Sequence, residues 1–379
     1  MAAWEYRRLA SPDDLVGLNW EQHSNLGLFY NRCYLRSFFS SLSADPKLIV
    51  GMNSTGGASS VVPAYKTRES TYDYFHPGRL LHALLMRVGR YDLAAASEPL
   101  LSRDYFVAAI PFGYTSPFLA VSGDQIDAAL DALEKEARAD GVLNLACLYY
   151  SQAESLLNET LIKRGYLTTI LESNGVIEID PAWMSLDDYF AQLGRRRLRR
   201  ERLTFCNRGY RCEWHSQLTE GLINTAVQLE AMLLKRKGTN LAESELRDWY
   251  LMVRDSLPQS YVVIEVTRTD GSPVAIALFL KNNRTLIGKA IGIKDDRHDH
   301  IYFNIAYYEP IKYAIEHDFR AIDYGPASHG VKRRRGAKPE PLYGAFKFQP
   351  HTAFVDLWQT ISLALGQAQS NAWGRSKDN

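Results

Sequence analysis

Two arginine-rich segments carry the clearest candidate chemistry in the sequence. RRRLRRER (195–202) contains six arginines in eight residues, and VKRRRGAK (331–338) groups three arginines and two lysines around a glycine. Guanidinium groups are planar, bidentate donors that suit phosphate, and a polyanion releases counterions when it binds them. One such run alone is more often a solvated basic face. The candidate phosphate-binding residues are Arg195, Arg196, Arg199, Arg200, Lys332, Arg333, Arg334, Arg335 and Gly336.

The overall charge makes these segments informative. The chain has 44 lysines and arginines against 43 aspartates and glutamates, a net charge of +1, so acids elsewhere must compensate for the two runs. This distribution favours local contact with an anionic partner over a surface that coats long nucleic acid. With 46% hydrophobic and 23% charged residues, the composition is that of a globular protein and excludes a disordered or collagenous chain.

The first half of the sequence predicts alternating strands and helices. Two β-rich runs, 46–52 and 58–66, flank a stretch of turn formers and predict a hairpin. A helix that begins at Gly123 or Asp124 and ends before Gly141 precedes a buried strand at 142–150, because apolar residues recur at helical spacing and the glycine follows the last turn. A helix at 153–163 and a strand at 166–180 follow, and Pro181 marks the end of a first domain.

The second half gives stronger local signals. Ser185 with Asp188 resembles a capping box and predicts one helix that continues into the first arginine segment. Pro310 either begins a separate helix or kinks the helix predicted over 301–315. The remaining predictions are helices from Thr219 to Gly238 and over 246–257, hairpin strands at 261–268, 273–281 and 284–293, and strands at 320–325 and 341–348.

A weak internal repeat indicates two related domains. Residues 132–150 and 311–325 each form a helix, a short break and an apolar strand, and each follows a hairpin at a distance. We therefore predict an α/β fold with mixed α+β sheets, built from an N-terminal domain (1–180) and a C-terminal domain (181–365). We expect the polar tail (366–379) to be disordered.

Several classes of protein are excluded or disfavoured. No apolar run is long enough to span a bilayer, so we expect a cytoplasmic protein with no membrane partner. The four cysteines form no C-x-x-C pair, and the nearest candidate metal cluster, His298 and His300 beside three aspartates, reads better as a solvated loop, so no metal is expected. Nucleophile-elbow, P-loop and dinucleotide fingerprints are absent from the sequence.

The sequence resembles a known family at its second basic segment. YFNIAYYEPIKYAIEHDFRAIDYGPASHGVKRRRGAKP (302–339) is similar to the C-terminal signature of GNAT-superfamily proteins related to Fem peptidyltransferases and to the peptidoglycan biosynthesis/recognition group. The shared features are a helix with paired aromatics, a strand ending in glycine, and then a lysine and an Arg-Gly. YFAQLGRRRLRRERL (189–203) also resembles the arginine-rich helix of the family. About a third of the chain is covered closely.

This resemblance implies two GNAT-like (acyl-CoA N-acyltransferase fold) domains in tandem and transfer of an aminoacyl group to an amine. Several members use aminoacyl-tRNA as donor, without a cofactor, ATP or a metal. Lys332 and Arg335-Gly336 match the basic loop of the family, Gly325 its glycine, and Arg196, Arg199 and Arg200 its basic helix. Asn304, Tyr302 and the Pro326-Ala327-Ser328 loop depart from the common pattern, which suits a specialised enzyme of natural-product, antibiotic or cell-wall biosynthesis.

Transfer from an activated ester needs mainly positioning, stabilisation of an oxyanion and removal of one proton. Asp323 and Tyr307, with Glu309 and Tyr324, could remove or relay the proton, while Lys332 or Lys347 could face a phosphate or the oxyanion. Each is also a plausible structural residue. We predict Asp323, Tyr307, Lys332 and Lys347 as catalytic residues, and Asn304, Tyr308, Glu309, Tyr324 and Phe346 as residues that bind the small-molecule or peptide amine.

Two other functions remain open from the sequence. An acyl-CoA-dependent N-acyltransferase, using acetyl-CoA or another acyl-CoA, shares the fold, but only RRRGAK approaches the glycine-rich loop that holds CoA pyrophosphate. A non-catalytic module that binds RNA or an anionic glycan would use both arginine segments equally well. The sequence does not fix the oligomeric state, the amino acid or the acceptor.

Overall fold

The computed structural model describes residues 5–18, 20, 27–41, 45–52, 58–118, 123–151, 154–239, 241–294, 299–349 and 353–374. These residues form two compact α/β units. Unit 1 contains residues 1–174 and 339–379, and unit 2 contains residues 175–338. Among the described helices, none has the length and apolarity needed to cross a bilayer.

Unit 1 is a mixed sheet covered by helices, with strand order β1-β2-β3-β4-β5-β12-β6. Neighbouring strands are antiparallel from β1 to β4, β4 and β5 are parallel, and β5 and β12 are antiparallel. The strands are β1 (Glu5–Leu9), β2 (Asp45–Met52), β3 (Ala58–Lys66), β4 (Tyr105–Ala108), β5 (Asn144–Ser151), β6 (Leu167–Glu178) and β12 (Lys338–Lys347). The helices are α1 (Arg32–Ser41), α2 (Pro77–Arg87), α3 (Tyr91–Ser97), α4 (Gly123–Ala139), α5 (Ser155–Lys163), α13 (Ala353–Asp356) and α14 (Trp358–Trp373).

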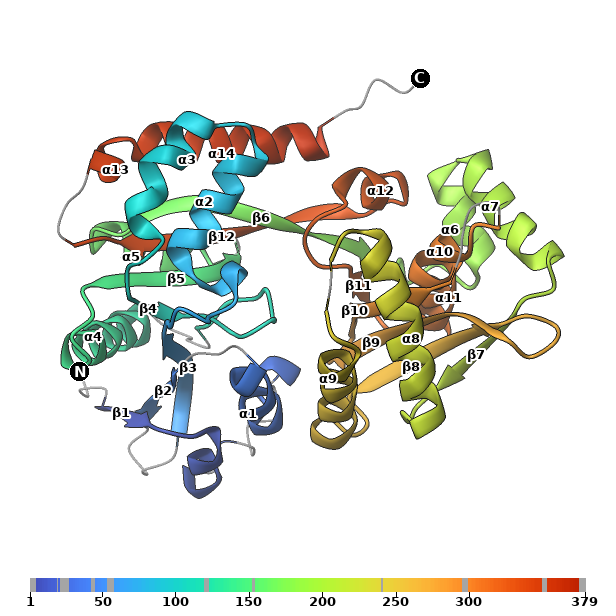
Figure 1. Ribbon diagram of the computed structural model, residues 1–379, viewed down its shortest axis with the longest axis horizontal. Helices are drawn as coiled ribbons and strands as arrows, with labels where there is room; N and C mark the ends of the chain where they lie inside the picture. Colours follow the sequence, from blue (N-terminus) through green and yellow to red (C-terminus); the bar gives the residue numbers. More distant parts are fainter. Residues whose placement is uncertain are drawn as a thin grey trace. The chain divides into compact units, whose positions relative to one another are not determined.

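The core of unit 1 forms where α4 and α5 cover the sheet. Ile126, Leu130 and Leu133 of α4 lie on one helical face and are buried against apolar residues of the strands. On another part of the unit, α14 packs beside α2 (Figure 1). The predicted disorder of the tail is therefore wrong for residues 366–373, because α14 continues to Trp373 and buries Trp358, Ile361 and Leu365; residues 375–379 lie outside the described part of the chain.

Unit 2 repeats the same order of pairings, with strand order β6-β11-β10-β9-β8-β7. Strands β7 to β10 are antiparallel, β10 and β11 are parallel, and β11 pairs antiparallel with the end of β6. The strands are β7 (Arg211–His215), β8 (Tyr261–Thr267), β9 (Pro273–Asn282), β10 (Thr285–Ile293) and β11 (Ala321–Asp323). The helices are α6 (Leu186–Leu193), α7 (Arg196–Asn207), α8 (Glu220–Arg236), α9 (Glu243–Ser256), α10 (Ile301–Phe303), α11 (Glu309–Glu316) and α12 (His329–Arg334).

Helix α8 covers the sheet of unit 2 and packs beside α9 (Figure 1). Its approach to β10 is close at Gly292, where a Cβ atom would lie 2.5 Å from the backbone nitrogen of Glu230. Any side chain at this position would push the helix away from the strand. The predicted N-caps are confirmed, since the side chains of Ser185 and Thr219 accept hydrogen bonds from the backbone of Asp188 and Leu222.

The two halves of the chain exchange one strand. The β5-α5-β6 and β11-α12-β12 segments have the same order, yet β12 pairs with β5 while the end of β6 pairs with β11. This exchange explains why residues 339–365, predicted in the C-terminal domain, belong to unit 1 instead. The boundary predicted after residue 180 lies close to the observed division after Asn174.

Two predicted helices are interrupted. Gly194 takes a left-handed conformation (φ +62°) and ends α6, so the arginine segment forms a separate helix, α7. The predicted 301–315 helix divides into α10, a π-helical turn at Asn304–Tyr308 and α11. Pro310 lies in the first turn of α11, where its missing N–H costs no helical hydrogen bond.

Candidate active site

The candidate site begins where two parallel strands of unit 2 separate. Strands β10 and β11 pair over only three residues, from Thr285–Ala321 to Ile287–Asp323, after which β10 continues alone on that side. On its other side β10 carries a β-bulge, because Gly288 pairs with Phe279 and Ala290 with Leu278. Lys289 is the extra residue of the bulge. Bulges re-aim side chains and are frequent beside active sites.

A pocket of about 190 Å³ lies at this separation. Its size suits a group no larger than an amino acid residue. Several of its lining residues are small, and two lysines and three tyrosines supply its polar groups. The lining residues are Ala277, Phe279, Gly288, Lys289, Ala290, Ile291, Tyr302, Ala306, Tyr307, Tyr324 and Lys332.

The π-helical turn positions Tyr307, one of the three tyrosines of the pocket. Tyr307 lines the pocket and lies with its ring 4.7 Å from that of Tyr324. Burial raises the pKa of both phenols above the usual value, so both remain protonated hydrogen-bond donors at neutral pH. The hydroxyl of Tyr324 is buried and has no hydrogen-bond partner among the described residues. A buried polar atom in that state beside a pocket points to a ligand group.

Lys289 is the titratable group of the pocket that the sequence analysis missed. Burial lowers the pKa of its amine to about 8, and the carboxylate of Asp323 partly opposes this shift. A large share of the amine is therefore neutral at slightly alkaline pH. The sequence contains one signal for it, a lysine within the apolar strand LIGKAIGI, but the bulge that turns it to the pocket depends on the pairing of β9 and β10.

Lys332, a predicted catalytic and phosphate-binding residue, holds the loop after β11. Its Nζ atom donates to the carbonyl oxygens of Tyr324 (2.8 Å), Gly325 (2.6 Å) and Pro326 (2.9 Å). An ammonium group has three donors. The same loop contains Ala327 and Ser328 at positive φ (+66° and +55°), a conformation that costs non-glycine residues energy and persists only when surrounding contacts enforce it. Asp323 also serves the loop, because its carboxylate accepts a 2.7 Å hydrogen bond from the Gly325 N–H.

The predicted basic loop divides into buried and exposed residues. Arg335 is 2% exposed, forms a 2.6 Å ion pair with Glu201 of α7, and lies 3.6 Å above the ring of Phe303. The Tyr308 hydroxyl donates to the same carboxylate. Gly336 follows with φ +81° and ends the turn. Arg334 is exposed and Arg333 is partly buried.

A second buried ion pair contains two predicted substrate-binding residues. Arg202 of α7 contacts Glu309 at 2.6 Å and donates to the Asn304 side chain at 2.9 Å. Asn304 is fully buried and Glu309 is 5% exposed. These contacts, with those of Tyr308, give Asn304, Tyr308 and Glu309 structural partners, and their predicted role in substrate binding stays a prediction.

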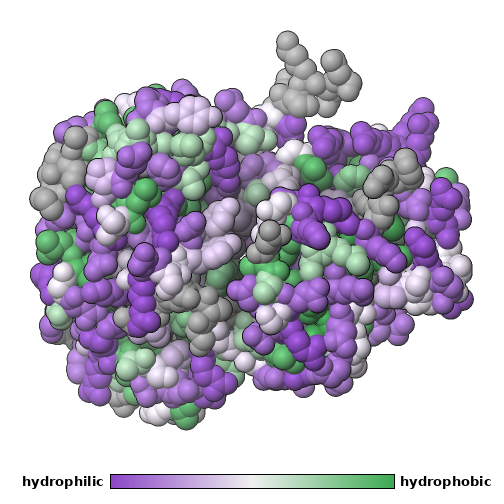
Figure 2. Space-filling view, viewed as in Figure 1, coloured by the Kyte–Doolittle hydropathy of each residue, from purple (hydrophilic) through white to green (hydrophobic). Residues whose placement is uncertain are grey.

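The outer face of α7 presents the predicted phosphate-binding arginines. Leu198, Glu201 and Phe205 are its buried residues, whereas Arg196, Arg199 and Arg200 are exposed. Arg195 is exposed as well and donates to the backbone carbonyl of Arg334, which ties the two basic segments together. Figure 2 shows mainly hydrophilic side chains over this part of unit 2. Among the described residues, no group of three candidate ligands could hold a metal; Asp295, Asp296 and His298 lie outside them.

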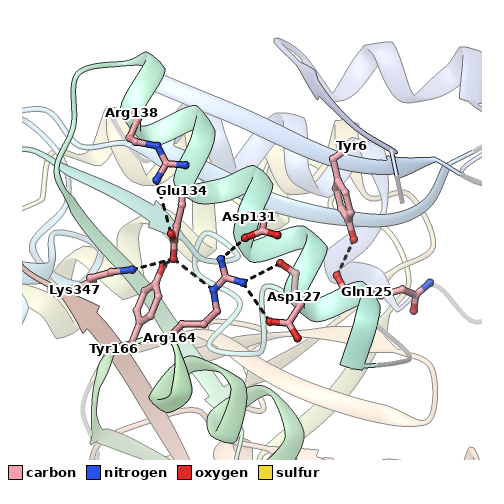
Figure 3. Close-up of polar contacts among 9 residues, drawn as sticks. All are labelled: Tyr6, Gln125, Asp127, Asp131, Glu134, Arg138, Arg164, Tyr166 and Lys347. Carbon is pink, nitrogen blue, oxygen red and sulfur yellow. Dashed lines mark hydrogen bonds and ion pairs between the residues drawn. The ribbon is translucent and has the colours of Figure 1, made fainter. Parts of the chain in front are cut away.

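Lys347 and Phe346, the two remaining predicted site residues, belong to unit 1. The Lys347 amine lies 3.2 Å from the Glu134 carboxylate of α4 and 5.2 Å from the ring centre of Tyr166. Figure 3 shows Glu134 at the centre of a network that also includes Arg138 and Arg164. Phe346 is fully buried against Phe348 and Trp358.

The corresponding place in unit 1 is filled by aromatic side chains. Strands β4 and β5 also pair in parallel and then separate after Ala108 and Cys147. Tyr149, with φ +66°, is 2% exposed there and contacts the rings of Phe75 and Tyr114. Unit 2, by contrast, has a pocket with polar lining at its strand separation.

Comparison with solved structures supports the fold. The chain is similar to FemX, with a TM-score of 0.59, 11% identity, and coverage of 94% of this chain and 100% of that chain. It is also similar to L-PGS from Bacillus licheniformis (TM-score 0.57, 12% identity, 93% and 98% coverage) and to a conserved protein from Bacteroides thetaiotaomicron (0.53, 13%, 91% and 99%). At these identities the similarity concerns the fold alone. No curated protein sequence matches the chain.

The family comparison covers most of the chain. Residues 105–360 match the FemAB-like family, which is described as peptidoglycan biosynthesis/recognition. This range includes the separation of β10 and β11, the π-helical turn, the Lys332 loop and both arginine segments. The match confirms the resemblance of the 302–339 segment to this family, and the similarity to FemX supports the predicted α/β fold. The chain therefore belongs to the FemAB-like family.

Proposed function

We propose that this chain is an acyltransferase that moves an aminoacyl group from an aminoacyl-tRNA to the amine of a peptide or small molecule and forms an amide bond. The observation that carries the proposal is the pocket of unit 2, because it combines a titratable amine with tyrosine donors at the separation of two parallel strands. Family membership supports a role in peptidoglycan-related aminoacyl transfer.

The exposed arginines of α7 support a tRNA donor. Arg196, Arg199 and Arg200 are exposed on the same unit as the pocket. Phosphate contacts from such residues position a nucleic acid without reading its sequence. The aminoacyl ester is already activated, so the pocket has to position it, stabilise the oxyanion and accept one proton. The tyrosine hydroxyls are the donors available for the oxyanion.

A transfer assay tests the donor and the reaction together. Total tRNA charged with a radiolabelled amino acid mixture is incubated with the protein and a panel of amines, including a stem peptide with a free lysine side chain, free amino acids and polyamines. We expect a labelled amide whose formation is abolished when ribonuclease is added at the start. A ribonuclease-resistant product formed from acetyl-CoA would contradict the proposal. RNA binding without product from either donor would instead support a non-catalytic binding module.

A further inference from the structure

We propose that the amine of Lys289 is the proton acceptor of the transfer reaction, an inference that rests on the proposed function. Lys289 takes the proton from the attacking amine and returns it to the leaving ribose oxygen. The position of the residue is the first argument. Lys289 is the extra residue of the β10 bulge and lines the pocket at the point where β11 leaves β10.

The neighbours of Lys289 leave space for a substrate. Gly288 and Ala290 flank it along β10, and Ala277 and Ala306 line the same pocket from β9 and the π-helical turn. A row of small residues around one long polar side chain shapes a cavity rather than a packed core. Tyr324, whose buried hydroxyl has no hydrogen-bond partner among the described residues, lines the same pocket.

The groups around Lys289 set its charge. Asp323 of β11 attracts a proton to the amine, whereas burial disfavours the ammonium form and dominates, which brings the pKa to about 8. Lys332 and the phenols of Tyr302, Tyr307 and Tyr324 line the same pocket, and no aspartate or glutamate is among the described residues that line it. Lysine is a more effective base when its pKa approaches the working pH.

The other groups that could accept the proton already make hydrogen bonds or remain protonated at neutral pH. The Asp323 carboxylate accepts from the Gly325 N–H, and the Lys332 amine donates to three carbonyl oxygens. Burial raises the pKa of Tyr307 and of Tyr324, so their phenolate forms are rare at neutral pH. Lys289 is the pocket residue whose neutral form is accessible near physiological pH.

Lys289 can carry the single proton that the transfer reaction moves. The acceptor nitrogen forms a bond to the ester carbonyl carbon, and one proton of that nitrogen passes to the neutral Nζ atom. The bond between the carbonyl carbon and the ribose oxygen then breaks, and Nζ returns the proton to that oxygen. An ester and an amine become an amide and an alcohol, and Lys289 ends neutral, as it began.

The first experiment measures Lys289 without requiring activity. The wild-type protein is labelled with trace acetic anhydride from pH 6 to 11, and acetylation of each lysine is quantified by peptide mass spectrometry. We expect the reactivity of Lys289 to reach half its maximum near pH 8. Lys281 on β9 and Lys312 on α11 serve as the reference lysines. A Lys289 profile that coincides with those of Lys281 and Lys312 would overturn the inference.

The second experiment tests the role in transfer with the charged tRNA mixture and stem peptide. Single-turnover rates are measured against pH for the wild type, Lys289→Arg, Lys289→Met and the control Lys281→Met. We expect the wild-type rate to rise up to about pH 8, both Lys289 variants to lose at least about 100-fold with no such rise, and the control to match the wild type. Arginine keeps the charge but cannot accept the proton.

The outcomes separate this inference from the proposed function. Transfer by Lys289→Arg at the wild-type rate and with the wild-type pH profile would overturn the role of Lys289 alone. Absence of transfer by the wild type would overturn the proposed function, and the proton-acceptor role with it. Unchanged circular dichroism of both variants shows that a lost rate does not reflect unfolding.

Discussion

Arg335 and Glu201 form a 2.6 Å ion pair in the interior of unit 2, and each residue is 2% exposed. They lie 134 positions apart in the sequence, on α7 and at the end of α12. The pair joins the two arginine-rich segments from the inside, while Arg195 and the Arg334 carbonyl join them at the surface. Arg335 of the basic loop therefore stabilises the fold, whereas its neighbour Arg334 is exposed.

Removal of one member of this pair should destabilise the protein. Glu201→Gln leaves the Arg335 guanidinium buried without its charge partner, so we expect the free energy of unfolding to fall by about 3–5 kcal/mol. Urea denaturation followed by circular dichroism measures the change. Arg197→Ala is the matched control, because its side chain is 77% exposed although it contacts the same carboxylate; a change below about 1 kcal/mol is expected there. Equal losses in both variants would contradict the structural role.

Replacement of both members should restore most of the stability. The double variant Glu201→Leu with Arg335→Met removes the two charges together, and apolar replacement of a buried pair is often neutral. We expect its unfolding midpoint to lie closer to the wild type than that of Glu201→Gln. A double variant as unstable as the single one would show that the Tyr308 hydrogen bond or the contact with Phe303 carries the effect.

The exposed face of α7 should determine the salt dependence of RNA binding. Arg196→Ala with Arg199→Ala and Arg200→Ala removes three exposed cations, so the slope of log K against log salt should fall by about 2–3. Filter binding of total tRNA from 50 to 200 mM salt measures this. The control removes the exposed Lys235, Lys237 and Lys312 of the same unit and should keep the wild-type slope. Equal slopes for all three proteins would exclude α7 from the interface.

Lys332 should be needed for the loop rather than for contact with phosphate. Lys332→Met removes the donor from three carbonyl oxygens, and we expect the unfolding free energy to fall by about 2 kcal/mol. Proteolysis within residues 324–328 should become faster, because the positive φ angles of this loop lose their support. Wild-type stability and proteolysis, combined with weaker tRNA binding, would instead favour the predicted phosphate contact.

The burial of the Lys289 amine should make the free energy of unfolding depend on pH. The pKa of Lys289 is lowered to about 8 in the folded state from 10.5, so the unfolded chain binds more protons between these values and the stability contributed by this group rises with pH there. Lys289→Met removes the penalty and should stabilise the protein at pH 7 by about 1–3 kcal/mol, allowing for the partial exposure of the residue. The difference should shrink between pH 8 and 10.5, as thermal melts across that range would show. A variant less stable than the wild type at pH 7 would contradict this account.

Local signals were sufficient for most elements of the fold. The caps at Ser185 and Thr219, the hairpin strands β8 to β10 and the helix before β5 follow from side chains within a few residues of each feature. The strand exchange could not be predicted from local signals. Strand β12 pairs with β5 about 190 to 200 positions away, and the residue patterns of β6 and β12 suit either as a neighbour of β5. Pairing of that kind is determined by packing across the whole sheet.

The candidate site was predicted only in part, because some of its features depend on contacts between segments that are distant in the sequence. The sequence identified the segment around Tyr307, Tyr324 and Lys332, because its motif is contiguous. It could not separate Arg335 from Arg334, since their burial depends on Glu201 in a distant helix. Lys289 was missed because a single lysine in an apolar strand matches no sequence motif. The β-bulge that directs its side chain is visible only in the pairing of β9 and β10.

The exchanged strand has a consequence for biosynthesis. Because β12 is translated after all of unit 2, the sheet of unit 1 lacks the partner of β5 until residues 342–347 have left the ribosome. The edge of β5 is exposed in the nascent chain during that interval, and such an edge can pair with the wrong strand. Unit 2 has no such delay, since β6 precedes it, so the half with the pocket can complete its sheet first.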